Sequence, residues 1–293
     1  MNARWVALRD GRSRPELAAA TRALAVALAF AACVAVALAA EPDGSANWRF
    51  AIPALFAAAA VSSVAGFAFS ALALAVSGWC FRDPVAMVST FLVCSLAIQL
   101  YAVIRLRAEI DPRSVAPFVL GGLAGTPLGT LMLLQLDATR LAAFLGAMLL
   151  GWCVFMLARR PGWTLRSSFA GDVAAGALGG VTGGVAAFPG AVPVLLLGLR
   201  GWSKARQRAT FQPYILVMQV LSLASLAAQG GFDGFDGADL PLLPMAAAVV
   251  AALLGARIGI RLFARLDERQ FARWVLMLLA ASGLAMIVRG WPG

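Results

Sequence analysis

Long apolar segments separated by short polar stretches make up most of this 293-residue chain. Residues 1–16 are polar and basic, residues 17–40 are rich in Ala, Val and Leu, and two groups of four apolar segments follow. The groups comprise approximately residues 50–79, 84–104, 114–135 and 139–158, and then residues 170–200, 209–228, 240–263 and 270–288. Because a helix crosses a bilayer with about 20 apolar residues, this pattern predicts an all-α bundle of transmembrane helices.

The two groups of segments repeat one another in sequence. Residues 125–159 align without a gap to residues 255–289, which lie 130 positions later. The coinciding residues include Gly125 with Gly255, Gly129 with Gly259, Asp137 with Asp267 and Arg159 with Arg289. Many secondary transporters are built from two such repeats, and their substrate site lies where the repeats meet. Transport is therefore the first hypothesis for the function.

The repeats divide the chain into four parts. We expect a basic cytoplasmic N-terminus at residues 1–16, an additional transmembrane helix at 17–40, a first transmembrane repeat at 50–159 and a second at 169–289. A cleaved signal segment is the alternative for residues 17–40, because small residues end that segment. Its apolar part is longer than the core of an ordinary signal peptide, which favours the helix.

Composition narrows the class of protein. Hydrophobic residues make up 61% of the chain and charged residues 13%, whereas a soluble domain carries about 25% charged residues. The apolar runs do not alternate with polar positions, which argues against a transmembrane β-barrel. The net charge of +10 comes from basic residues scattered between apolar segments. Such loops set membrane topology, so we expect a lipid bilayer and no nucleic acid as partner.

Residues that usually carry catalysis or bind metals are sparse. The chain has no histidine, and its four cysteines do not have the spacing of a metal site. We therefore expect no enzyme activity, no metal and no cofactor. Acidic residues are nearly absent from the apolar segments, and Asp172 is expected at the membrane interface. Passive anion exit, or exit driven by the membrane potential, would need no buried acid.

The first apolar segment of each repeat is about 30 residues long, which is too long for one span and too short for two. Small or turn-forming residues interrupt both segments. The first interruption is expected at Ser62, Ser63, Ala65 and Gly66, and the second at Gly179, Gly180, Thr182, Gly183 and Gly184 followed by Phe188-Pro189-Gly190. Interrupted helices at matching places in two repeats point to a transporter's binding site.

The distribution of basic residues indicates that each interrupted segment is a hairpin. If both segments enter the membrane and return to the same side, 20 basic residues lie inside and 4 outside, whereas single crossings place 16 inside and 8 outside. The hairpin topology therefore obeys the positive-inside rule better. It leaves three full crossings in each repeat, and this odd number predicts two repeats of opposite orientation.

Several stretches resemble one transporter family. The segment GALGGVTGGVAAFPGAVPVLLLGLRGWSKARQRATF at residues 176–211 is similar to the second-repeat signature of the sulfite exporter TauE/SafE family. Residues 64–91 resemble a degenerate first copy that keeps Gly66-Phe67 and lacks a proline matching Pro193. Residues 117–137 resemble the family's glycine-rich third helix ending in Leu-Asp. The resemblance covers about residues 50–289 and implies a bacterial inner-membrane permease for sulfur-containing or other small organic anions.

Candidate substrate-binding residues come from the two interruptions and the helices that follow them. Backbone N–H groups at the start of a helix near Gly190 could hold an anion, with Ser70 at the comparable place in the first copy. Neutral side chains would complete the site, and Thr90-Phe91 and Thr210-Phe211 occupy corresponding positions. The full set is Gly66, Ser70, Thr90, Gln99, Thr182, Gly183, Gly184, Gly190, Thr210 and Gln212.

Each of these features has a structural alternative. Glycines such as Gly121, Gly122, Gly125 and Gly129 let neighbouring helices approach closely, and polar side chains form hydrogen bonds within or between helices. Arg257 and Arg261 lie one helical turn apart; they could attract an anion or extend to the cytoplasmic interface. The loop containing Lys204, Arg206 and Arg208 could set topology or draw anions toward the cytoplasmic mouth.

The sequence thus predicts a permease for a small anion, with sulfite or an organosulfonate as candidates, and a possible homodimer. A passive anion channel is the alternative within transport. A non-transporting membrane scaffold would not need two interrupted segments. An intramembrane enzyme would need a catalytic pair or metal cluster, which the sequence does not display.

The hairpin topology makes a direct prediction. In a variant whose native cysteines are replaced, single cysteines at Arg107 and Lys204 should react with a membrane-impermeant thiol reagent from the same face of the membrane. A cysteine at Arg82 should react from the opposite face. Labelling of positions 107 and 204 from different faces would rule out the hairpin topology.

Overall fold

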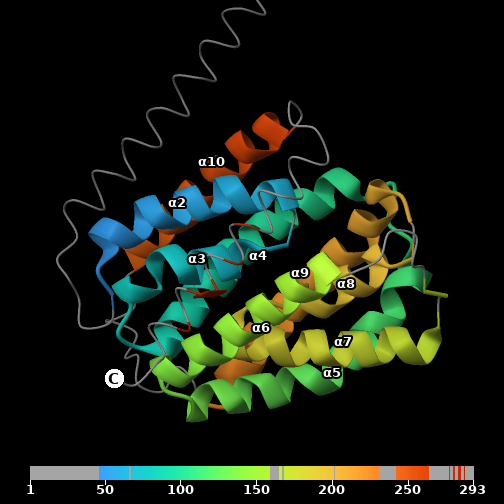
Figure 1. Ribbon diagram of the computed structural model, residues 1–293. Helices are drawn as coiled ribbons and strands as arrows, with labels where there is room; N and C mark the ends of the chain where they lie inside the picture. The colour runs from blue at the N-terminus through green and yellow to red at the C-terminus, as the bar shows by residue number, and fades with distance from the viewer. Residues whose placement is uncertain are drawn as a thin grey trace, which may run out of the picture.

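The computed structural model describes residues 46–65, 67–158, 165–166, 168–200, 202–230 and 242–263, and single positions near the C-terminus. The predicted segments 1–16 and 17–40, Gly66 and most of segment 270–288 lie outside the described residues. The described part of the chain is helical and contains no β-strand (Figure 1). Five of its helices are long and apolar enough to cross a membrane.

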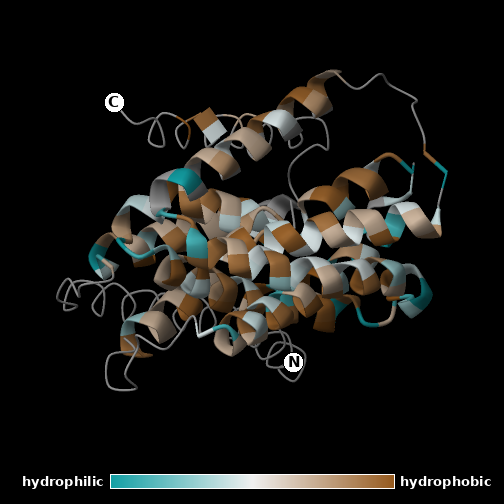
Figure 2. Cartoon of the chain, turned by 90° about the horizontal axis from the view of Figure 1, so that it is seen from below, coloured by the Kyte–Doolittle hydropathy of each residue, from teal (hydrophilic) through white to brown (hydrophobic). Residues whose placement is uncertain are grey.

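The helices fall into the two predicted groups. The first contains α2 (Trp48–Ala65), α3 (Phe69–Ser77), the 3-10 turn η1 (Gly78–Cys80), α4 (Pro84–Leu106), α5 (Pro112–Gln135) and α6 (Ala138–Ala158). The second contains α7 (Phe169–Ala186), α8 (Ala191–Gly198), α9 (Lys204–Ala228) and α10 (Leu242–Phe263). Large apolar side chains also cover the outer surface, for example Leu120, Leu123 and Leu128 on α5, as a bilayer requires (Figure 2).

Local sequence explains where α4 and α5 begin. Asp83 and Asp111 precede Pro84 and Pro112, and each aspartate accepts hydrogen bonds from backbone N–H groups of the first turn. Proline at the first helical position loses no hydrogen bond, because that N–H has no partner within the helix. The Ser114 hydroxyl and the Arg113 N–H stabilise the ionised Asp111 side chain and lower its pKa. The two aspartates therefore fix the starts of two spans.

The first interrupted segment doubles back on itself. The N–H of Asn47, just before α2, donates to the carbonyl of Cys80 at the end of η1, with an N···O distance of 2.8 Å. The rings of Phe50 and Trp79 lie beside each other, with centroids 5.4 Å apart. The two ends of the segment therefore lie together, as the hairpin prediction requires.

The second interrupted segment doubles back in the same way. The N–H of Leu165 donates to the carbonyl of Leu199 beyond α8, at 2.8 Å. Arg200 forms an ion pair with Asp172 in the first turn of α7, and both side chains are buried. Asp172, expected at the membrane interface, lies in the first turn of α7 with its side chain enclosed by the protein, where it joins the start and the end of the hairpin.

The interruptions are shorter than the sequence suggested. Helix α7 continues through Gly179–Gly184 and ends at Ala186, so the prediction of a break at these glycines was wrong. The chain leaves the helix at Ala187, whose φ of 56° is in the left-handed region, and α8 begins at Ala191. In the first repeat, Ser62 and Ser63 are likewise helical, and the break follows α2.

Glycines bring helices of different repeats into backbone contact. A Cβ atom added at Gly121, Gly125 or Gly129 of α5 would collide with carbonyl oxygens of α7. A Cβ atom at Gly255 or Gly259 of α10 would collide with carbonyl oxygens of α2. The structure thus confirms the packing interpretation of Gly121, Gly125 and Gly129 and shows the same role for Gly255 and Gly259. It also shows that the third long helix of each repeat packs against the first helix of the other.

The glycine contacts can be tested against a glycine that packs against nothing. We expect Gly259→Val to destabilise the protein strongly, because backbone atoms of α2 cannot move aside as side chains can. Gly151→Val on α6 is the control, since no atom lies within 4 Å of an added Cβ there. The thermal unfolding temperature of each purified variant in detergent measures its stability. Equal unfolding temperatures for the two variants would contradict the backbone contact.

The buried ion pair makes a second prediction. Asp172→Asn should destabilise the protein by about 3–5 kcal/mol, because Arg200 would remain buried without a counter-charge. The double variant Asp172→Leu/Arg200→Met should recover most of that loss. Asp137→Asn is the control, because its ion pair with Arg140 is exposed and such pairs contribute about 0–1 kcal/mol. A double variant less stable than Asp172→Asn would contradict this account.

Candidate functional site

The two interruptions meet in the interior of the bundle. The Ser70 hydroxyl, in the first turn of α3, donates to the carbonyl of Ala187 at 2.6 Å. The Phe67 and Phe188 rings stack, with centroids 6.1 Å apart and an interplanar angle of 17°. A Cβ atom added at Gly190 would lie 3.2 Å from the Cβ of Phe67. The breaks of the two repeats therefore lie against each other.

A cavity of about 400 Å³ lies beside this meeting point. Its walls come from the end of α2, the start of α3, the second half of α4, the start of α9 and the end of α10. Its polar lining residues are Ser62, Ser63, Ser95, Gln99, Tyr101 and Gln212, and its apolar ones are Phe67, Phe69, Ile98, Ala102, Leu106 and Ile260. The remaining lining residues are Arg105, Arg208, Arg257 and Arg261. Among the described residues, no carboxylate lines the cavity.

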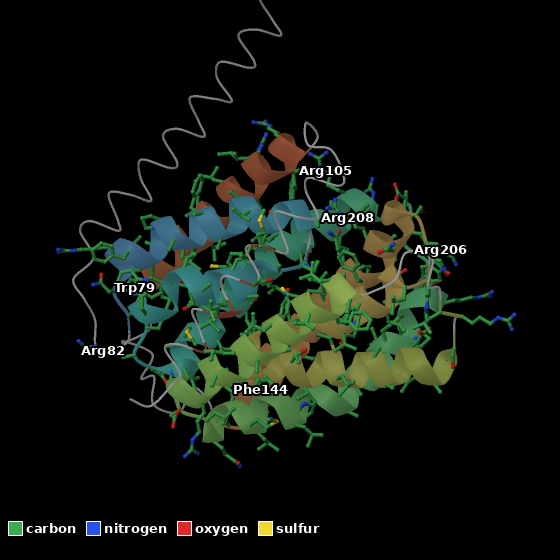
Figure 3. The ribbon with its side chains drawn as sticks, in the orientation of Figure 1. Trp79, Arg82, Arg105, Phe144, Arg206 and Arg208 are labelled. Carbon is green, nitrogen blue, oxygen red and sulfur yellow. The ribbon has the colours of Figure 1, made fainter. Side chains whose placement is uncertain are left out.

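The four arginines give the cavity a positive potential. Arg105 donates to the Tyr101 hydroxyl at 3.2 Å and lies over the Tyr101 ring. In the described ranges, no carboxylate lies within 4.0 Å of Arg105, Arg257 or Arg261. Arg105 and Arg208 lie at one end of the bundle, and Arg82 and Trp79 lie at the opposite end (Figure 3). Arginine side chains gathered on one low-dielectric cavity attract anions.

Two of the predicted binding residues line this cavity. Gln99 of α4 and Gln212 of α9 are both buried, at 4% exposure each. In the part of the chain that the structure describes, the Oε1 atom of Gln212 has no hydrogen-bond partner. An amide side chain can both donate and accept hydrogen bonds. The two glutamines therefore place neutral hydrogen-bonding groups between the arginines and the interruptions.

The two predicted threonines are placed differently. Thr90 donates to the carbonyl of Ala86 at 2.8 Å, and Thr210 donates to the carbonyl of Arg206 at 3.0 Å. Each hydroxyl therefore bonds to its own helix, and neither residue belongs to the cavity lining. Their proposed contact with substrate is not supported by this arrangement.

The remaining predicted residues build the interruptions. The Thr182 hydroxyl donates to the carbonyls of Gly179 and Phe188, which secures the end of α7. Gly183 packs against Pro189, Gly184 against the backbone of α5, and Gly190 against Ile215. The cavity reaches the start of α3 at Phe67 and Phe69 but not the start of α8 at Gly190. The first repeat, rather than the second, thus contributes its interruption to the cavity wall.

The sequence interpretation missed the cavity arginines as a group. Arg208, Arg257 and Arg261 were considered as anion attractors only as alternatives. Arg105 entered only the topology count, because counting charges cannot distinguish a side chain that faces lipid from one that faces a cavity. A signal was present in the spacing. Arg208 and Gln212 are four residues apart, as are Ser95 and Gln99, so each pair lies on one helix face. Two polar stripes on equivalent helices indicate a shared lining.

Comparison with known proteins agrees with this architecture. A model of the family described as sulfite exporter TauE/SafE matches residues 50–286, which include the first repeat, nearly all of the second and every residue of the cavity lining. Searches of curated proteins and of solved structures gave no match. Because the family model covers most of the chain, this multi-pass membrane protein belongs to the sulfite exporter TauE/SafE family.

Proposed function

We propose that the protein is a bacterial inner-membrane permease that moves a small anion, with sulfite or an organosulfonate as candidate substrates. The observation that carries this proposal is the cavity in which four arginines and two buried glutamines converge without a lining carboxylate in the described chain. Positive groups in a low-dielectric site attract anions, and neutral amides hold an anion without trapping it. Membership of the TauE/SafE family supports the same conclusion.

The arrangement of the helices supports two repeats of opposite orientation. Helices α4 and α9 are equivalent, since each follows the hairpin of its repeat. The cavity is lined by the second half of α4 and by the first half of α9, so the two helices run in opposite directions. Repeats related by rotation about the membrane normal would place them parallel. An inverted relationship therefore accounts for this pairing and for the exchanged packing of α5 with α7 and α10 with α2.

Transport then proceeds by alternating access or an elevator-like rearrangement around the paired interruptions. The cavity opens at the end that carries Arg105 and Arg208, which the positive-inside rule assigns to the cytoplasm. Phe67 and Phe188 stack next to its inner end. Asp172, the acidic residue considered for proton coupling, is paired with Arg200 and lies outside the cavity lining. Exit driven by the membrane potential therefore fits the site better than proton coupling through Asp172.

The arginines of α10 provide the test. The double variant Arg257→Gln/Arg261→Gln should reduce kcat/KM for sulfite in proteoliposomes by about tenfold or more, with KM affected most, because the lost charges act on anion capture. The effect should weaken at high salt, which screens exposed charges. Arg82→Gln is the matched control, because Arg82 lies at the opposite end (Figure 3). Equal losses in both variants would contradict the proposed site.

Flux measurements in the same proteoliposomes distinguish a carrier from a channel. External sulfite should accelerate the exit of labelled internal sulfite from a carrier, because the two fluxes share one alternating site. Flux that rises linearly with concentration and shows no counterflow would identify a passive anion channel. Absence of protein-dependent flux for every small anion would favour a non-transporting membrane component.

A further inference from the structure

The cavity ends at a hydrogen bond between the two equivalent helices. Ser95 of α4 lines the cavity, and the Nε2 atom of Gln219 on α9 donates to its hydroxyl at 2.6 Å. Gln219 itself does not line the cavity. A direct side-chain bond between α4 and α9 thus lies at the edge of this cavity.

Polar residues continue along α9 beyond this bond. Arg208 and Gln212 line the cavity, and Gln219 and Ser222 follow at intervals of seven and three residues. These intervals are close to whole helical turns, so the four residues share one face of α9. At 1.5 Å per residue, Ser222 lies roughly 15 Å further along the helix than Gln212. The stripe therefore leads from the cavity toward the opposite side of the membrane.

Like Oε1 of Gln212 inside the cavity, two atoms of this stripe beyond the cavity have no hydrogen-bond partner within the described chain. They are Oε1 of Gln219 and Oγ of Ser222, in side chains that are 1% and 0% exposed. Turning the Gln219 amide lets Oε1 accept from the Ser95 hydroxyl and leaves Nε2, a donor whose missing bond an anion can supply, without a partner. Ser77 provides a contrast, since it is equally buried and bonds to the carbonyl of Ala73 in its own helix.

Unpaired polar atoms inside a membrane protein are costly, so they persist where a solute or water supplies the missing bond. Beyond Arg208, the α9 stripe contains amides and a hydroxyl but no charged side chain. The Born cost of removing an ion from water grows with the square of its charge, so a doubly charged anion would lose about four times as much as a singly charged one. A path without charged side chains therefore favours a singly charged anion over a doubly charged one.

We propose that Gln219 and Ser222 form a second, neutral binding station for a singly charged oxoanion, and that the Ser95–Gln219 hydrogen bond separates this station from the arginine-lined cavity. The inference rests on the proposed function, because it extends the route of the same anion. The arginines capture the anion, and breaking one hydrogen bond admits it to the station. The sulfur oxygens then accept hydrogen bonds from the Gln219 amide and the Ser222 hydroxyl.

The experiment compares anion binding with anion movement in the full-length protein. Wild-type protein in nanodiscs and in proteoliposomes is measured for equilibrium binding and for flux of methanesulfonate, a singly charged probe. Gln219→Leu and Ser222→Ala should each reduce flux about tenfold, the equivalent of one lost hydrogen bond to a charged group. Binding should change by less than twofold, because the cavity arginines remain. Ser77→Ala is the control for removal of a buried hydroxyl, and unfolding temperatures exclude a loss of fold.

The outcomes distinguish this inference from the proposed function. Absence of anion binding and flux in the wild type would refute the permease itself. Wild-type flux that survives both substitutions unchanged would refute the second station and leave the permease intact. Sulfate, a doubly charged probe of similar shape, should bind the cavity yet move at least about tenfold more slowly than methanesulfonate. Equal rates for the two anions would refute the neutral path.

Discussion

Polar backbone groups need hydrogen-bond partners inside a bilayer, and this constraint decides where the two helix breaks can lie. Each break exposes carbonyl and N–H groups that lipid cannot satisfy. In the structure, side-chain hydrogen bonds within and between the breaks satisfy some of these groups. Thr182 bonds to the carbonyl of Phe188, and Ser70 of the first repeat bonds to the carbonyl of Ala187 of the second. Because the first repeat supplies a hydrogen bond to the break of the second, the two repeats must meet at the centre of the bundle.

The cavity follows from that meeting. Side chains at a break cannot pack as closely as those along a regular helix, and Phe67, Phe69 and Gln212 line the resulting space. The glycines of α5 and α10 instead make the packing tighter, because they bring whole helices into backbone contact. Tight packing at the periphery and loose packing at the centre are thus set by the positions of small residues. The duplicated glycines explain why both repeats share this design.

Much of this architecture could be predicted from the sequence because hydrophobicity and duplication leave strong signals. The apolar segments, the doubling back and the packing role of Gly125 were predicted, and the candidates Gln99 and Gln212 both line the cavity. The predicted break at Phe188-Pro189-Gly190 is present, but its extension over Gly179–Gly184 was wrong, because glycines can equally disrupt a helix or pack against another one. The packing of α5 against these glycines decides between the two roles, and α5 lies about 50 residues away in the chain. The pairing of Asp172 with Arg200 was missed for the same reason.

The two repeats have diverged in how they close their hairpins and in what they present to the cavity. The first repeat joins its ends through aromatic rings, Phe50 and Trp79, where the second uses the ion pair of Asp172 and Arg200. The first repeat also provides the break that borders the cavity, while α10 of the second provides Arg257 and Arg261. An inverted pair of identical halves would offer the same surface to both sides of the membrane. Divergence of this kind places the cationic groups at one end and allows capture to differ from release.

This asymmetry bears on the source of energy for the proposed export. A potential that is negative inside drives an anion outward by roughly 2.3 kcal/mol per charge for each 100 mV. That gain needs no proton-binding acid along the route, and the described cavity lining contains none. The proposed route needs an anion concentrated at the cytoplasmic mouth, a role that we propose for the arginines, and a core without charges that would hold the anion there. Cationic capture followed by neutral passage is therefore a sufficient physical basis for anion export by this fold.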